Sequence, residues 1–234
     1  MSIRRLLLKQ YHRLVQRIVP PYFDSETEVA HLELLCAKYP ELLQFDKLTQ
    51  AYSKELEPYY RVYTQEVSNS SATISLRLAV FLITMCRIVK PKTILDLGSG
   101  FSSFVFRHFM KNDALELTVH SVDTSSYWLD KTRNFLLSYK LPASHLITWK
   151  AFLRQSTQKY DFVLCDISMG VRIQALPIIL SFTGPSTVAI FDDIHIPLYS
   201  RRLKYWLQKS PHNSYSLKFY TEDEFGRYSL AVTA

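Results

Sequence analysis

A short apolar run that ends in a glycine turn, residues 93–103, constrains the fold of this chain more than any other stretch. Residues 94–97 predict a buried strand, and Gly98 and Gly100 follow it at once. Glycines at these positions let a ligand approach the backbone, and a serine just beyond them can cap a helix whose free N–H groups face the same point. The stretch therefore predicts a strand, a ligand-binding loop and a helix in succession.

The spacing of this loop argues against two common nucleotide-binding motifs. The dinucleotide fingerprint needs a third glycine where Ser103 stands, and a phosphate loop needs a lysine that does not follow here. Asp96-Leu97-Gly98-Ser99-Gly100 instead resembles motif I of class I S-adenosylmethionine (SAM)-dependent methyltransferases. The resemblance implies that Asp96, Gly98, Ser99 and Gly100 hold the amino-acid tail and ribose of SAM, and a glycine turn without a ligand is the alternative.

Strand-like and helix-like segments alternate regularly from residue 93 onward. The predicted strands are 94–97, 117–122, 146–149, 160–165 and 187–191, followed by a closing hairpin of 215–220 and 227–233 around a polar turn. This order predicts a parallel sheet with right-handed crossovers, whose ligands lie beyond the carboxyl ends of the strands. The hairpin resembles the last two strands of the methyltransferase sheet. We therefore expect an α/β, Rossmann-like, seven-stranded and mostly parallel sheet with helices on both faces and an antiparallel C-terminal hairpin.

The first 70 residues predict an N-terminal helical extension to a methyltransferase domain of residues 71–234. Residues 3–18 have the spacing of a basic amphipathic helix, which would dock on its own domain or a second subunit, or lie on an anionic membrane or serve in targeting. Ser25 and Glu28 form a capping-box pattern for a second helix, and a third begins after Asp46 and is disturbed at Pro58.

Composition limits the classes of partner and compartment. The chain has 234 residues, 47% of them hydrophobic, which suits one sizeable core. Five basic residues precede the first acidic one, Asp24, and supply much of the net charge of +7, so nucleic acid is not an expected partner. The three cysteines lie far apart and fit a reduced, cytoplasmic compartment, and the apolar runs are shorter than the roughly 18 residues of a membrane span.

Asp123 follows the second predicted strand and is the candidate for the SAM ribose. A carboxylate there can accept hydrogen bonds from both ribose hydroxyls, a role that the resemblance also implies, and Thr124 lies next to it. The family commonly places an acidic residue after strand three to bind adenine. This chain has Lys-Ala-Phe at 150–152, so we expect Phe152, or else Trp149, to stack on the base.

Acidic residues also follow the fourth and fifth predicted strands. Asp166, Asp192 and Asp193 should lie together because these strands are neighbours, and three carboxylates without a counter-charge would repel. A magnesium ion would relieve that repulsion and activate an acceptor hydroxyl. The Asp192-Asp193 pair resembles the one in metal-dependent sugar O-methyltransferases of the macrocin type, although Ser168 stands where these have a further Asp. The rival is metal-free catalysis with His195 or an aspartate as the general base.

We therefore predict a cytoplasmic, SAM-dependent O-methyltransferase that acts on a small molecule or a sugar. The catalytic candidates are Asp166, Asp192 and His195, with Asp166 also near SAM, and the metal candidates are Asp166, Asp192 and Asp193. The sequence lacks an Asn-Pro-Pro-aromatic pattern after strand four, which argues against exocyclic amines as acceptors. The alternative is a non-catalytic SAM-fold module that docks through the basic N-terminal helix, and homo-oligomers fit either function.

Overall fold

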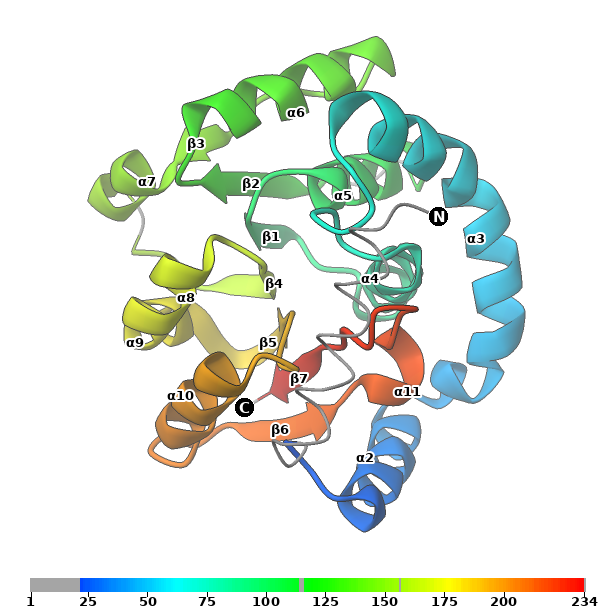
Figure 1. Cartoon of the computed structure of the whole chain (residues 1–234), viewed down its shortest axis with the longest axis vertical. Coiled ribbons are helices and arrows are strands. Elements are labelled where there is room, and N and C mark those ends of the chain that lie inside the picture. The colour runs from blue at the N-terminus through cyan, green and yellow to red at the C-terminus, as the bar shows by residue number, and fades with distance from the viewer. Residues whose placement is uncertain (1–21, 114–115, 156, 234) are drawn as a thin grey trace.

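The computed structural model describes residues 22–113, 116–155 and 157–233, and the described strands form one seven-stranded sheet (Figure 1). The strand order is β3-β2-β1-β4-β5-β7-β6. Among these strands, β7 alone runs opposite in direction to the other six, so it pairs antiparallel with both β5 and β6. The order reverses between β1 and β4, so the carboxyl ends of these two strands flank the expected ligand position. The predicted fold class is confirmed. The strands are β1 (Thr93–Leu97), β2 (Thr118–Asp123), β3 (Leu146–Thr148), β4 (Tyr160–Cys165), β5 (Thr183–Phe191), β6 (Asn213–Ser216) and β7 (Leu230–Thr233).

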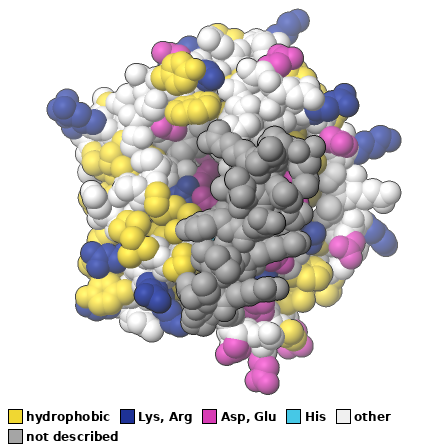
Figure 2. All heavy atoms as spheres, in the orientation of Figure 1, with side chains coloured by type: hydrophobic (Ala, Val, Ile, Leu, Met, Phe, Trp, Pro, Cys, Tyr) yellow, Lys and Arg dark blue, Asp and Glu magenta, His cyan; other side chains and the backbone are white. Residues whose placement is uncertain are grey.

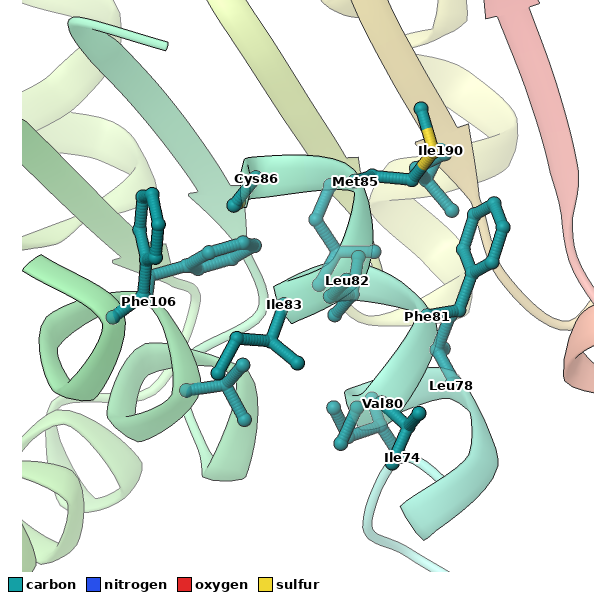
Figure 3. Packing of buried hydrophobic residues seen from close by; sticks show 14 of the residues in the cluster. Ile74, Leu78, Val80, Phe81, Leu82, Ile83, Met85, Cys86, Phe106 and Ile190 are labelled. Atoms are coloured by element: carbon teal, nitrogen blue, oxygen red, sulfur yellow. The ribbon is translucent and has the colours of Figure 1, made fainter. Parts of the chain in front are cut away.

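Helices cover both faces of the sheet, so β1, β4 and β7 bury side chains on both sides. Ile94 of β1 belongs to the hydrophobic cluster under α4 and α5, whereas the next residue, Leu95, belongs to the cluster under α8, α9 and α10. In Figure 3, side chains of α4 such as Leu82 and Ile83 pack among Phe106 of α5 and Ile190 of β5. The helix α4 (Leu76–Val89) precedes β1, and the helices between the strands include α5 (Phe101–Asn112), α6 (Ser126–Ser138), α7 (Trp149–Gln155), α8 (Met169–Gln174), α9 (Leu176–Ser181) and α10 (Pro197–Leu207).

The helices before α4 pack on the same core rather than standing apart. They are α2 (Ser25–Lys38), the 3-10 turn η1 (Pro40–Gln44), α3 (Phe45–Val62) and the π-helical turn η2 (Tyr63–Val67). Leu35, Phe45 and Leu56 are buried in the cluster that also contains the α4 side chains. The division at residue 70 stays a prediction, and the basic helix predicted for residues 3–18 lies outside the described residues.

One local prediction for these helices is wrong. The N-cap of α2 is Asp24 rather than Ser25, because the Asp24 carboxylate accepts a hydrogen bond of 2.8 Å from the Thr27 N–H. Pro58, where a disturbance is predicted, lies inside α3, and the helix continues to Val62. Leu56 and Tyr63 on either side of it are buried, so tertiary packing outweighs the backbone hydrogen bond that a proline removes.

The C-terminal hairpin is shorter than predicted and contains a helix. The run 215–220 leaves the sheet after Ser216 and turns into α11 (Lys218–Thr221). Leu217, Tyr220 and Thr221 are all buried, and their spacing of three and four residues is that of a helix face. The burial pattern of this segment is therefore that of a helix and not the alternation predicted for a strand. Among the described residues, no helix has the length and apolar character to cross a membrane.

Candidate functional site

A cavity of about 400 Å³ opens at the carboxyl ends of β1, β2 and β4. Its volume lies within the range of roughly 300–1,000 Å³ typical of small-molecule sites. The lining comes from the β1–α5 loop, the ends of β2 and β4, the start of α6 and the loop before α4. The residues are Tyr63, Ser68, Ala72, Thr73, Ile74, Gly98, Ser99, Gly100, Phe101, Ser102, Asp123, Thr124, Ser125, Trp128, Asp166 and Ser168.

The two loop glycines are required by close approach of other parts of the chain. Gly98 has φ of +110°, and a Cβ built on it would lie 2.5 Å from the backbone oxygen of Asp166. A Cβ on Gly100 would lie 3.2 Å from the hydroxyl of the buried Tyr63. The loop is therefore held between the end of β4 and the η2 turn, and it presents backbone rather than side chains to the cavity.

Asp96 supports this loop from below and does not line the cavity. Its side chain is fully buried, and its two carboxylate oxygens accept hydrogen bonds from the hydroxyls of Ser102, Ser103 and Ser121. Burial raises the pKa of Asp96, although these hydrogen bonds and the nearby Arg107 act in the opposite direction. The direct contact with SAM predicted for Asp96 is therefore corrected to a supporting role at the start of α5.

Asp123 lies in the cavity where the sequence predicts the ribose site. One carboxylate oxygen accepts from the Ser99 N–H at 2.9 Å and from the Ser99 hydroxyl at 3.2 Å, and the other accepts from the Ser125 N–H at 2.9 Å. A carboxylate has about four acceptor positions and three are used here, so one is open to a ribose hydroxyl and a second opens if the Ser99 hydroxyl turns away. Gly98, Ser99, Gly100, Asp123 and Thr124 thus line one cavity, as the sequence predicts.

Phe152 is the cofactor candidate that the structure places elsewhere. The strand β3 ends at Thr148, and Trp149 begins α7, so Phe152 turns inward on a helix. Its ring is 1% exposed and packs against Phe182 with ring centroids 5.2 Å apart. The predicted stacking of Phe152 on adenine is therefore corrected. Trp128, near the start of α6, lines the cavity in its place.

The three aspartates at the ends of β4 and β5 do lie together. One carboxylate oxygen from each of Asp166, Asp192 and Asp193 lies within 4.8 Å of the other two. Asp166 reaches the cavity, whereas Asp192 is 7% exposed and accepts a hydrogen bond of 2.7 Å from the Ser229 hydroxyl. The juxtaposition agrees with the sequence prediction.

The sequence analysis missed Arg172 of α8, which supplies the counter-charge of this cluster. Its Nη2 pairs with Asp166 Oδ1, and its Nη1 lies 3.2 Å from Asp193 Oδ2. Burial raises the pKa of Asp166 well above its usual value, against the effect of Arg172. For Asp193 the opposing effects of Arg172, His195 and Arg227 outweigh burial and lower the pKa. The signal in the sequence was a lone arginine seven residues beyond the end of a buried strand.

His195 lies behind the aspartates rather than in the cavity. Its side chain is 4% exposed, and its Nδ1 lies 3.8 Å from Asp193 Oδ1. Among the described lining residues, the ends of β4 and β5 contribute Asp166 and Ser168, but neither Asp192 nor His195. The structure therefore favours Asp166 over the other two predicted catalytic residues as the group that meets an acceptor.

The loop before α4 forms the other wall of the cavity, and hydrogen bonds from Arg227 hold it in place. The Arg227 guanidinium donates to the backbone carbonyls of Ser70, Ser71 and Thr73 at 3.2 Å each. The same side chain pairs with Asp223 at 2.7 Å. The segment before β7 therefore fixes the wall that faces Asp166 and Ser168.

Solved structures similar to this chain are methyltransferases. The methyltransferase PaMTH1 of Podospora anserina, solved with SAH bound, has a TM-score of 0.61 at 13% identity, over 79% of this chain and 92% of its own. The O-methyltransferase TomG of Streptomyces achromogenes, involved in tomaymycin synthesis and solved with SAM, has a TM-score of 0.59 at 14% identity, over 74% and 87%. An O-methyltransferase of Bacillus cereus in complex with SAH has a TM-score of 0.53 at 14% identity, over 95% and 96%.

No protein-family model matches the sequence, and no curated protein matches it. The similarity to known proteins therefore rests on the structure. At these identities it shows that the chain has the Rossmann-like fold of SAM-dependent methyltransferases.

Proposed function

We propose that this protein is a SAM-dependent methyltransferase that methylates a hydroxyl group of a small molecule or a sugar. One observation carries the proposal: the cavity at the switch between β1 and β4 joins the backbone of Gly98 and Gly100 to the carboxylate of Asp123. These are the groups that a ligand with a vicinal diol and a polar tail requires. The similar structures solved with SAM or SAH share the fold.

The lining residues fit the parts of SAM. Asp123 would accept from the ribose hydroxyls, and the indole of Trp128, five residues along the chain, would stack on the adenine. The Gly98–Gly100 backbone and the N-terminus of α5 would face the amino-acid tail. When bound, SAM supplies an electrophilic methyl group on a sulfonium sulfur.

Asp166 is the residue that we assign to the acceptor. Arg172 binds its Oδ1, and we assign Oδ2 to the acceptor hydroxyl. Its raised pKa brings this carboxylate nearer to that of an effective general base at neutral pH. The acceptor oxygen bonds to the methyl carbon as the sulfur–carbon bond breaks, and its proton passes to Asp166. Ser168 and the loop before α4 would orient the acceptor.

The predicted magnesium ion does not fit the aspartate cluster as the chain arranges it. The cation expected from the sequence would meet Arg172, whose guanidinium already pairs with Asp166 and Asp193. The proposed reaction therefore needs no metal and uses Asp166 alone for the proton. On the face in Figure 2, basic and acidic side chains are interspersed around the outline of the molecule.

The first test is calorimetric titration of the full chain with SAM and SAH. Asp123→Asn should weaken binding about 10- to 100-fold, because hydrogen bonds to a charged group contribute roughly 1.5–3 kcal/mol. Asp161→Asn is the matched control. Asp161 also accepts hydrogen bonds from backbone N–H groups, at 2.8 and 3.0 Å, but at the opposite end of the sheet. The affinity of Asp161→Asn for SAM should therefore equal that of the wild type. Equal affinity in the wild type and a folded Asp123→Asn would remove Asp123 from the site.

The second test is methyl transfer to a panel of small hydroxyl compounds and sugars, with and without a chelator. The proposed chemistry expects transfer that survives chelation and falls at least 100-fold in Asp166→Asn while SAM still binds. SAM binding without transfer to any acceptor would instead support the non-catalytic module considered from the sequence.

A further inference from the structure

Arg172 uses every hydrogen-bond donor of its guanidinium within the chain. Its Nε donates to the Ile167 carbonyl oxygen. Its Nη1 donates to the Asp192 carbonyl oxygen at 3.1 Å and to Asp193 Oδ2 at 3.2 Å. Its Nη2 donates to the Asp166 carbonyl oxygen at 3.0 Å and to Asp166 Oδ1. These five acceptors match the five N–H groups of a guanidinium.

The five acceptors come from two neighbouring strand ends. Asp166 and Ile167 follow β4, whereas Asp192 and Asp193 follow β5, so one side chain joins both ends. The guanidinium side chain is 6% exposed and lies over the ring of Tyr199, with its Cζ 5.6 Å from the ring centroid. An arginine in this setting is a fixed part of the fold, because withdrawing it would leave three carbonyls and two carboxylates without their donor.

A divalent cation and Arg172 compete for the same oxygens. The three aspartates offer oxygens within 4.8 Å of one another, which suits a hard divalent ion. Arg172 already holds two of the three carboxylates and places a positive charge among them. An added cation would have to displace a guanidinium that makes five hydrogen bonds, or accept its repulsion at close range.

We propose that Arg172 is the built-in cation of the Asp166–Asp192–Asp193 cluster, so that this cluster binds no divalent ion in the intact protein, and that a neutral side chain at position 172 opens a divalent-cation site there. The proposal rests on the geometry of the cluster and not on methyl transfer. The outcome of its test therefore does not depend on whether the protein methylates an acceptor.

The test measures binding of manganese(II) to the full chain by electron paramagnetic resonance and calorimetry, without SAM or an acceptor. In the wild type the cluster should bind no manganese. Any saturable binding that the wild type shows should therefore persist in Asp193→Asn. Arg172→Met, which keeps much of the length and apolar stem of arginine, should gain one manganese per chain, at least tenfold tighter than any binding by the wild type. The double variant with Asp193→Asn should lose that site, and Arg172→Lys, which keeps the charge, should not acquire it.

Saturable manganese binding by the wild type that Asp193→Asn abolishes would overturn the proposal, even if Arg172→Met failed to fold. A folded Arg172→Met that gains no manganese would also overturn it. Circular dichroism of each variant establishes folding before the titration. A second measurement uses the wild type alone: its melting temperature should be the same in chelator and in millimolar manganese, because a bound ion would stabilise the folded state.

Discussion

Gly98 is the position where the cofactor loop should be least tolerant of a side chain. The change Gly98→Ala adds a Cβ that would lie 2.5 Å from the backbone oxygen and 2.6 Å from the carbonyl carbon of Asp166. The residue also has φ of +110°, a conformation that disfavours any residue with a Cβ. Backbone strain of this kind costs about 1–3 kcal/mol, and overpacking costs about 1–3 kcal/mol more. We expect a loss of about 4 kcal/mol in the free energy of unfolding.

Thermal and urea denaturation of the full chain measure this loss. For a domain of this size, about 4 kcal/mol corresponds to a fall of about 8–16 °C in the melting temperature. Gly170→Ala is the matched control, since a Cβ on Gly170 meets no atom within 4 Å and the residue lies in α8. Alanine is the better helix former there, so this control should be neutral or slightly stabilising. If Gly98→Ala had the same melting temperature as Gly170→Ala and the wild type, the tight packing of the loop on β4 would be refuted.

Two further predictions concern pH and the N-terminus. Burial and the neighbouring Asp193 raise the pKa of Asp192 to about 6, so the folded state binds that proton more tightly than the unfolded chain, and stability is lost as pH rises from about 4 through 6. The free energy of unfolding of Asp192→Asn should therefore exceed that of the wild type by at most about 3 kcal/mol at pH 7, and by less toward pH 4. Urea denaturation at both pH values measures this difference, and a difference independent of pH would contradict the prediction. Deletion of residues 1–19 should leave the affinity for SAM unchanged while altering oligomeric state or membrane association, because the described cavity residues run from Tyr63 to Ser168. Titration and light scattering measure the two effects, and loss of the fold would show that the segment belongs to the core.

The sequence predicts well wherever a local pattern and a tertiary role coincide. The run 94–97, its glycine turn and Asp123 are found as expected, because a buried strand ending at a ligand loop leaves a signature in adjacent residues. The mostly parallel sheet followed from the regular alternation of strands and helices. Phe152 failed because β3 ends at Thr148 and α7 follows at once, so the residue lies on a helix with its side chain in the core.

Arg172 could not be found in this way, because its partners are set by three-dimensional packing. Four of its acceptors are backbone or side-chain oxygens of Asp166, Asp192 and Asp193, and the carbonyls leave no trace in the residue types. The sequence analysis counted the aspartates as three charges that needed a cation, which was sound electrostatics. It then weighed a magnesium ion against metal-free catalysis and did not consider the arginine in the next helix.

Asp96 and Asp166, at the ends of the neighbouring strands β1 and β4, are held by related means but with different consequences. At the end of β1, Asp96 is satisfied by three serine hydroxyls, one of which, Ser121, also accepts from Arg107 at 2.8 Å. That network is closed, so Asp96 is fixed in place beneath the loop and has no exposure to a ligand. At the end of β4, Arg172 meets Asp166 directly from one side, and the carboxylate remains 21% exposed at the cavity. An arginine that holds one oxygen of a carboxylate in place while the cavity side stays open is what a positioned general base requires. This difference between the two aspartates, more than the number of acidic residues, is why we propose a supporting role for Asp96 and a catalytic one for Asp166.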